Sequence, residues 1–277
     1  MKRILIIYLS LIASVTIFGS SVFTQSSESV VTGDEFSRSI KVKLFNGKNL
    51  DGWYTFLKER GRNNDPKNVF TIQKDVLRIT GEEWGYLMTN DEYENYMLEI
   101  EYKWGVKTFE PRLENARDCG ILIHSQGEDG ALNGIWMHSI ECNIIEGGSG
   151  DFVVVADGSE NFAVTCPVAP DKQRSSYVFQ PDGELVTINR GRINWFGRDP
   201  DWQDVKDFRG KNDIEKPLGK WNKMKIIAKG KEIYIYLNGV LVNHAVEVRP
   251  SKGRIQIQSE SAEIFFRRID LTPLSQY

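Results

Sequence analysis

The stretch EIYIYLNGVLVNH, residues 232–244, indicates the fold class. Its two halves are rich in Ile, Val, Leu and Tyr, which suit a half-buried strand, and Asn238-Gly239 separates them. Both central positions of a type I′ turn need positive φ, which Asn and Gly tolerate better than other residues. The stretch therefore predicts an antiparallel β-hairpin.

Strand patterns of the same kind recur along most of the chain. In residues 97–104, apolar side chains alternate with charged ones, as in a strand with one buried face. Similar short runs occupy residues 120–124, 140–145, 152–156, 185–189, 224–228, 254–258 and 264–271. Helical periodicity is nearly absent. Many short strands joined by hairpin turns predict an all-β fold, a sandwich of two antiparallel sheets.

The length fits a single domain over residues 41–277. Residues 158–219 are rich in Pro, Asp, Arg and Gly and interrupt the strand pattern, yet they contain Trp195 and Trp202. Disordered segments are poor in aromatic residues. We therefore expect an ordered, loop-rich excursion with a few strands, folded over one face of the sandwich. Its two tryptophans would form either a lid over a binding site or the excursion's own small core.

The N-terminus predicts export. Met1-Lys2-Arg3 precedes an apolar run over residues 4–18, which is typical of a signal peptide and short for a membrane span. We expect residues 1–25 to be the signal peptide and residues 26–40 a flexible leader. The mature protein would be periplasmic or secreted, without a membrane anchor. A net charge of -3 gives no electrostatic reason to expect nucleic acid as a partner.

The three cysteines are too few for a disulfide framework and lack the spacing of a metal site. Cys119 and Cys142 lie in apolar, strand-like runs, which predicts buried thiols. Export would permit one bridge among Cys119, Cys142 and Cys166, and the sequence leaves the pairing open.

Candidate chemistry concentrates in residues 141–146, ECNIIE. Side chains on a plain strand alternate between faces, so Glu141 and Asn143 would point one way and Glu146 the other. A bulge between Asn143 and Glu146 would return Glu146 to the face of Glu141. With that bulge, the two carboxylates would stand at a spacing used in sugar cleavage. Without it, Glu146 would begin the turn at Gly147-Gly148.

Two of the three histidines precede this run. His124 ends one strand and His138 lies just before Glu141, so the three side chains could meet at one strand end. They would then serve as acid/base groups or as ligands of a divalent metal, the one cofactor that the sequence suggests. His244, beside the hairpin, is expected to be structural.

A polar stripe is expected on one strand, where Arg254, Gln256 and Gln258 alternate with isoleucines. Such a stripe is either a solvated outer face or a row of donors and acceptors for sugar hydroxyls. Trp136 would stack on a sugar ring or pack in the core, and Arg112 is a weaker candidate for substrate binding. A carbohydrate is the expected partner.

Several stretches resemble the 3-keto-disaccharide hydrolase family. The run LFNGKNLDGW at 44–53 resembles the family's opening signature, and 85–89 with 93–102 resembles its second block. Residues 119–124 and 141–146 resemble two of its strands. Residues 221–222, 236–239 and 253–274 also match, so the resemblance covers about residues 42–274.

The resemblance implies a concanavalin A-like jelly roll with a concave, sugar-binding sheet. It also implies cleavage of glycosides whose sugar is oxidised at carbon 3. A ketone there acidifies the proton on carbon 2, so a base can remove it and the glycosidic oxygen leaves by elimination. On this basis Glu141 is expected to be the base and His124 or Glu146 the proton donor, with Arg254, Gln256 and Gln258 as binders.

Three other interpretations remain open. Residues 141–146 also resemble the catalytic strand of laminarinase-type retaining glycosidases, where the first Glu is the nucleophile and the second the acid/base. That family has Asp where this chain has Asn143, so the retaining mechanism becomes the alternative. A non-catalytic carbohydrate-binding module of the same fold would need stacking aromatics and amides but no paired acid and base. A third possibility, an envelope scaffold, predicts no sugar affinity.

Overall fold

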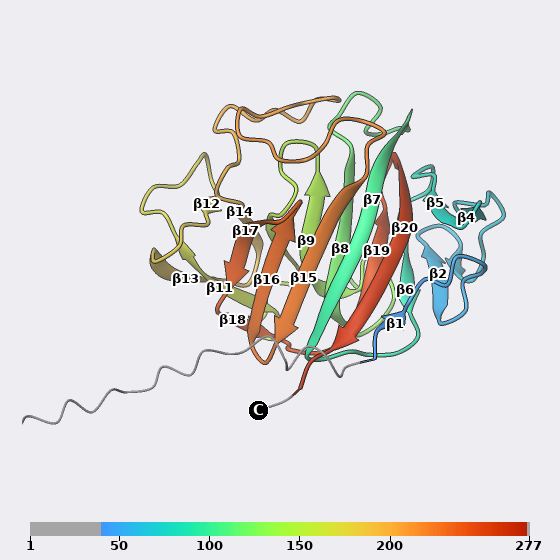
Figure 1. Cartoon of the computed structure of the whole chain (residues 1–277), viewed down its shortest axis with the longest axis horizontal. Coiled ribbons are helices and arrows are strands. Elements are labelled where there is room, and N and C mark those ends of the chain that lie inside the picture. Colours follow the sequence, from blue (N-terminus) through green and yellow to red (C-terminus); the bar gives the residue numbers. More distant parts are fainter. Residues whose placement is uncertain (1–39, 276–277) are drawn as a thin grey trace, which may run out of the picture. The chain divides into compact units, whose positions relative to one another are not determined.

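The computed structural model describes residues 40–275. The predicted signal peptide and, apart from Ile40, the predicted leader lie outside the described residues. Within residues 40–275 the regular elements are strands alone, and no helix is long and apolar enough to cross a membrane. Figure 1 shows two packed layers, with β7, β15 and β20 in front of β8, β9 and β19. The predicted all-β, jelly-roll sandwich is confirmed.

One sheet has eight strands. Their spatial order is β17 (Val240–Ala245), β16 (Glu232–Leu237), β15 (Asn222–Lys229), β7 (Tyr96–Thr108), β20 (Ala262–Pro273), β5 (Val76–Ile79) and β4 (Phe70–Gln73), with β1 (Val42–Lys43) paired to β20. The predicted hairpin is β16–β17, where Asn238 and Gly239 have φ of 50° and 93°. Both values lie in the left-handed region that the turn needs.

The second sheet has nine strands. Their spatial order is β12 (Tyr177–Val178), β14 (Gly191–Asn194), β10 (Phe152–Val155), β9 (His138–Ile145), β8 (Asp118–Gln126), β19 (Arg254–Ser259), β6 (Gly85–Thr89), β2 (Trp53–Leu57) and β3 (Gly61–Arg62). Strands β8, β9 and β19 form its centre. The pairing is antiparallel except between β12 and β14, which are parallel.

The excursion at 158–219 is ordered but is not folded over one face. Its strands β12 and β14 extend the nine-stranded sheet, and β11 (Ala163–Val168), β13 (Glu184–Ile188) and β18 (Glu247–Arg249) form a third, small sheet. The loop after β14 covers the ends of β8 and β9, where Trp202 Nε1 donates to the Glu146 carbonyl at 2.8 Å. Trp195 is buried in the main core instead of forming a lid or a separate core.

The core lies between the two large sheets and follows the alternation of the central strands. On β8 and β9 the inward side chains include Ile121, Ile140 and Ile144, and the intervening residues face outward. Cys119, Cys142 and Cys166 are buried free thiols. The outward side chains of these same strands, which a solvated sheet would expose, are also buried. A second layer of side chains therefore covers this face.

Candidate functional site

The candidate site lies on the outer face of the nine-stranded sheet, over Gly120 of β8. Asn143 of β9 lies directly opposite Gly120 on one side, and Gln258 of β19 follows Ile257, which pairs with Ile121, on the other side. Glu141 is two residues from Asn143 and shares its face. Three polar side chains from two strands thus surround a glycine.

Gly120 makes room for this arrangement. A Cβ atom built on it would stand 2.4 Å from Glu141 Oε1 and 2.6 Å from Gln258 Oε1. Real Cβ atoms do not approach other heavy atoms so closely, so any larger residue would displace both side chains. The absence of a side chain at Gly120 lets the carboxyl of Glu141 and the amide of Gln258 converge above the sheet.

Glu141 has an unusual environment for a carboxylate. Asn143 Nδ2 donates to Glu141 Oε1 at 2.6 Å and to Asp118 Oδ1 at 3.1 Å. Burial, with a smaller contribution from the negative charge of Asp118, raises the pKa of Glu141 from 4.5 to about 8, against the opposing effects of Arg192 and Asn143. A carboxyl with this pKa exchanges its proton near neutral pH, which suits acid/base catalysis.

Two more acidic side chains interact electrostatically with Glu141. Burial raises the pKa of Asp118, and the positive charge of Arg112, whose Nη2 lies 3.4 Å from Asp118 Oδ2, opposes that rise. Burial, together with Asp118 and Glu141, raises the pKa of Glu260 well above its ordinary value. The three acids repel one another when ionised, so protons are retained in the cluster near neutrality.

Arginines close the other side of the cluster. Arg192 Nη1 donates to Asn143 Oδ1 at 2.9 Å and to Asp151 Oδ2 at 2.7 Å. The guanidinium of Arg198 also contacts Asp151 Oδ2. Asp151 is fully buried and accepts a bond from the Trp195 amide as well, so it fixes both arginines. Arg192 is thus held within one hydrogen bond of the amide that contacts Glu141.

Aromatic side chains cover the same face toward β6 and β2. Trp136 stacks on Trp84 with ring centroids 6.4 Å apart and meets Tyr86 at 6.5 Å. The loop that carries Trp136 is fixed because Asp129 accepts hydrogen bonds from Tyr54 and Tyr86. Two roles were predicted for Trp136, stacking on a sugar ring or packing in the core. In the structure it packs in a small apolar cluster on the outer face.

The polar stripe on β19 divides into two parts. Gln256 Nε2 donates to Ser125 Oγ at 2.8 Å and to the Met137 carbonyl at 3.0 Å, and Arg254 Nε donates to the Asn90 carbonyl. These two side chains hold neighbouring backbone in place. Gln258 lies beside Glu141, and its Oε1 is buried without a hydrogen-bond partner among the described residues. Of the three predicted binders, Gln258 therefore lies closest to the acid cluster.

His124 does not reach the site, because β8 has a bulge. Ile123 pairs with Ile140 and Gln126 with His138, so two residues of β8 oppose Ser139 alone. His124 has φ of 54°, which turns its side chain inward against Tyr96. Its Nδ1 donates to the Pro250 carbonyl at 2.8 Å, and burial lowers its pKa to about 4. The predicted catalytic role of His124 is at odds with this position.

Glu146 also lies away from Glu141. The bulge on which its catalytic role depended is absent, since β9 pairs without interruption from Ile140 to Ile145, and Glu146 begins the following turn, as the alternative without a bulge predicts. Its Oε1 lies 2.6 Å from Arg117 Nη1, and its Oε2 accepts from the backbone amides of Arg117 and Asp207. Glu146 fixes the loop after β14 to the sheet, and the two-carboxylate arrangement of retaining glycosidases does not form.

His138 lies on the inward-facing side of β9, and its ring packs against Phe162 at 5.5 Å. The predicted meeting of His124, His138 and Glu141 is therefore wrong, because the sheet separates the histidines from Glu141. Within residues 40–275 no group of three or more His, Cys, Asp or Glu side chains is arranged to hold a metal ion. His244 stacks on Tyr234 at 4.0 Å and bonds Glu232, in agreement with a structural role.

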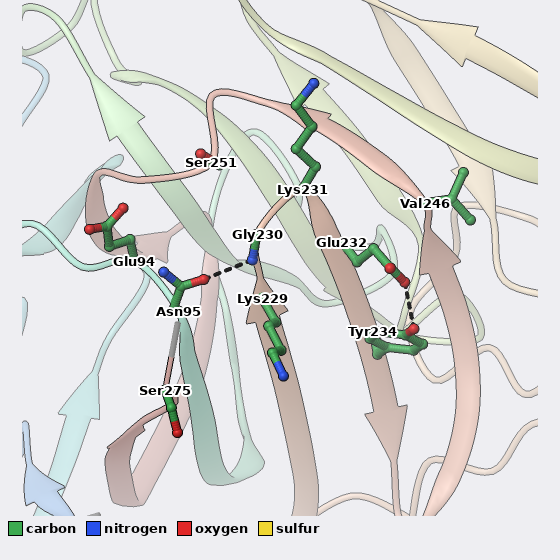
Figure 2. Close-up of a pocket in the computed structure, with 10 residues that line it drawn as sticks. All are labelled: Glu94, Asn95, Lys229, Gly230, Lys231, Glu232, Tyr234, Val246, Ser251 and Ser275. Carbon is green, nitrogen blue, oxygen red and sulfur yellow. Dashed lines mark hydrogen bonds between the residues drawn. The ribbon is translucent and has the colours of Figure 1, made fainter. Parts of the chain in front are cut away.

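A cavity of about 670 Å³ lies at the edge of the eight-stranded sheet, around the turn between β15 and β16. Figure 2 shows the Tyr234 hydroxyl directed at Glu232, and Asn95 bonded to the Gly230 amide. No residue lining this cavity is among the described residues with a buried, unpartnered polar atom. It therefore has none of the buried, unpartnered polar atoms found among the described residues, whereas Gln258 Oε1 beside the acid cluster is one of them.

The sequence pattern did not single out Asp118, Asp151, Arg192 or Glu260. Two-residue alternation could have pointed to Asp118 and Glu260, because each lies two residues from an outward position of the structure, Gly120 and Gln258 respectively. Arg192 and Asp151 had no such signal. They join the site only because β14, from the loop-rich excursion, pairs with β10.

The jelly-roll fold and the family match together indicate a carbohydrate-active protein of the glycosyl hydrolase kind. Residues 41–272 match the model of the 3-keto-alpha-glucoside-1,2-lyase-like domain, and the chain belongs to this family. The resemblance found in the sequence is thereby confirmed. A comparison with curated proteins gave no match.

Several solved structures are similar to this chain. A protein of Parabacteroides distasonis ATCC 8503, provisionally assigned as a glycosyl hydrolase, superimposes with a TM-score of 0.50 at 17% identity, over 89% of this chain and 99% of that one. A second such protein from the same organism gives 0.47 at 19% identity, over 85% and 100%. Bacillus licheniformis β-glucanase gives 0.42 at 10% identity, over 86% and 98%. The first of these supports the jelly-roll assignment.

Proposed function

We propose that the protein cleaves glycosides whose sugar carries a ketone at carbon 3. The observation that carries this proposal is Glu141, a buried carboxyl with a pKa of about 8 in a family of lyase-like domains. The ketone makes the proton on carbon 2 acidic. An ionised Glu141 takes that proton, the electron pair forms a carbon 1–carbon 2 double bond, and the glycosidic oxygen leaves carbon 1. Addition of water to the double bond would complete a net hydrolysis.

The leaving oxygen needs a proton, and we assign Glu260 as the donor. Burial and the charges of Asp118 and Glu141 raise its pKa well above the ordinary value, which favours its protonated form. It follows Gln258 by two residues in the sequence. In this scheme Glu260 takes the role that the sequence suggested for His124 or Glu146.

The negative charge that develops on the ketone oxygen needs stabilisation. Arg192 supplies a fixed positive charge beside Asn143, and Asn143 and Gln258 supply amide dipoles. Groups held in place before the reaction stabilise a developing charge without a reorganisation cost. The network from Asp151 to Arg192 to Asn143 keeps them in place.

We also propose that the protein acts outside the cytoplasm. The support is the basic, then apolar, N-terminal sequence. Periplasmic or secreted location would be tested by fractionating cells that express the full chain, with a variant lacking residues 2–25 as the control. Retention of the full chain in the cytoplasm would contradict this part of the proposal.

The substrate class is tested with matched disaccharides that differ only in a hydroxyl or a ketone at carbon 3. We expect turnover of the 3-keto compound alone, with an unsaturated sugar product detectable by its ultraviolet absorbance or by mass. Parallel reactions with a chelator test for dependence on a divalent metal. Equal turnover of the ordinary disaccharide would show that no ketone is needed and would overturn the mechanism, and binding without turnover would indicate a carbohydrate-binding module.

A further inference from the structure

We propose that a cavity beside Arg192 is the subsite for the leaving group, and that it takes a neutral, hydroxylated ring such as a second sugar. This inference rests on the proposed function and extends it to the other half of the substrate. The cavity has a volume of about 210 Å³ and lies between β14, the segment before β12 and the loop after β14. Its lining includes Arg192, Arg198, Asn194, Gln173 and Trp202.

The cavity adjoins the acid cluster through one side chain. Arg192 lines it, and the same guanidinium bonds Asn143, the amide that contacts Glu141. A ring held there would lie across Arg192 from the sugar being cleaved. That is the position expected for the group on the far side of the glycosidic oxygen.

Two buried acceptors in the cavity lack donors. Asn194 Oδ1 and Gln173 Oε1 are buried and have no hydrogen-bond partner among the described residues. A buried acceptor left unpaired destabilises the folded protein. A ligand that fits here must therefore supply hydrogen-bond donors, which hydroxyl groups do and a carboxylate or phosphate does not.

The arginines do not make this an anion site. Arg192 and Arg198 both contact Asp151, and Asp199 also lines the cavity. A guanidinium has five N–H donors, more than these contacts use, and the others can donate to hydroxyl oxygens. A hydroxyl both donates and accepts, so a ring of hydroxyls matches the two orphaned acceptors and the arginine donors together.

Shape and size agree with a single ring. Trp202 forms one wall, with the Arg198 guanidinium 4.2 Å from its ring centroid and its Nε1 fixed to the Glu146 carbonyl. A rigid indole offers a flat apolar surface for a sugar face. The volume is below the roughly 300–1,000 Å³ of sites for drug-sized ligands, which favours one sugar ring over a longer chain.

The test compares two substrates that share the 3-keto sugar, a disaccharide and the corresponding methyl glycoside. In the Gln173→Leu variant we expect the ratio of kcat/KM for the disaccharide to that for the methyl glycoside to fall about tenfold. Asn194→Leu should shift the ratio in the same direction. Gln180→Leu is the matched control, since Gln180 is exposed in the same segment outside the cavity lining, and should leave the ratio as in the parent protein. An unchanged ratio in Gln173→Leu and Asn194→Leu would overturn the subsite.

A binding measurement separates this proposal from the proposed function. Glucose is titrated into the parent protein and into Gln173→Leu by calorimetry, in the absence of any 3-keto substrate. Binding that weakens about tenfold in the variant supports the subsite even if no 3-keto glycoside is turned over. Absence of glucose binding to the parent, or its displacement by inorganic phosphate, would overturn it.

Discussion

Two buried glutamates, one on each large sheet, have similar positions but different partners. Glu141 and Glu263 are each 5% exposed, and each lies over a glycine of the neighbouring strand, Gly120 and Gly105 respectively. Arg78 holds Glu263 with two donors, at 2.7 and 2.8 Å, as a structural ion pair. Glu141 receives one amide bond, and the carboxylate of Asp118 is nearby.

The difference extends to the outer faces around them. On the eight-stranded sheet, charges form close pairs, such as Glu99 with Arg268 at 2.9 Å and Arg267 with Glu101 at 2.5 Å. On the nine-stranded sheet, carboxyls gather without enough cations, and an amide oxygen of Gln258 is left unpaired. Pairing of this kind stabilises a fold, whereas an unpaired, buried cluster is typical of a functional site.

The largest expected effect is on activity. Glu141→Gln keeps the shape but removes the base, so we expect turnover of a 3-keto disaccharide to fall about 10²–10⁴-fold. Glu263→Gln is the matched control and should keep turnover within about twofold of the parent protein. Steady-state kinetics on both variants measures this. Equal losses in the two variants would remove the distinction between the two glutamates.

The second effect is on stability against pH. The pKa of Glu141 is about 8 in the folded protein, and its ordinary value of 4.5 applies to the unfolded chain. The folded state therefore binds more protons between these values, and stability falls as pH rises from about 5 to 8, by about 4 kcal/mol from this group. Glu141→Gln has no such proton, so its stability relative to the parent should increase over that range.

Chemical denaturation at pH 5 and at pH 8 tests this effect, since groups common to both proteins cancel in the difference. The Glu263→Gln variant, which loses an ion pair, should be less stable than the parent at both pH values. A constant difference between the parent and Glu141→Gln would mean that Glu141 is ionised throughout.

The third effect concerns the carboxylate that the sequence paired with Glu141. Glu146→Ala leaves the buried Arg117 with Asp207 as its remaining partner, and we expect a loss of about 3 kcal/mol in unfolding free energy. Thermal unfolding measures it. A loss of turnover at a temperature where the variant is fully folded would restore a catalytic role to Glu146.

The smallest effect compares the two glycines. An added Cβ would stand 2.4 Å from Glu141 Oε1 in Gly120→Ala and 2.3 Å from Glu263 Oε2 in Gly105→Ala. We expect about tenfold lower turnover in Gly120→Ala, equivalent to about 1.4 kcal/mol, and little change in turnover in Gly105→Ala. Similar kinetics in both would show that the position of Glu141 tolerates displacement.

The sequence predicted those parts that follow from local pattern. The hairpin at Asn238-Gly239, the all-β sandwich and the outward position of Glu141 beside Asn143 depend on turn chemistry and two-residue alternation. His124 could not be placed in this way, because one extra residue in β8 reverses the face of its side chain. Alternation assumes a regular strand, and no residue pattern marks the strand that bulges.

Long-range pairing accounts for the remaining differences. Glu146 was expected to face a substrate, but its partner Arg117 lies 29 residues away in the sequence and satisfies it. Arg192 reaches Asn143 only because β14 adds to the sheet edge. Neither contact leaves a periodic signal in the sequence, so neither could be read from residues 141–146 alone.

The placement of β14 has a consequence for how such an enzyme could diversify. The proposed base, Glu141, comes from a central strand whose neighbours fix it from both sides, whereas Arg192 and the residues around the adjoining cavity come from the excursion at 158–219. Insertions and exchanges are tolerated more readily in such a peripheral segment. Relatives of this chain could therefore change the group they release while keeping the same proton-transfer chemistry.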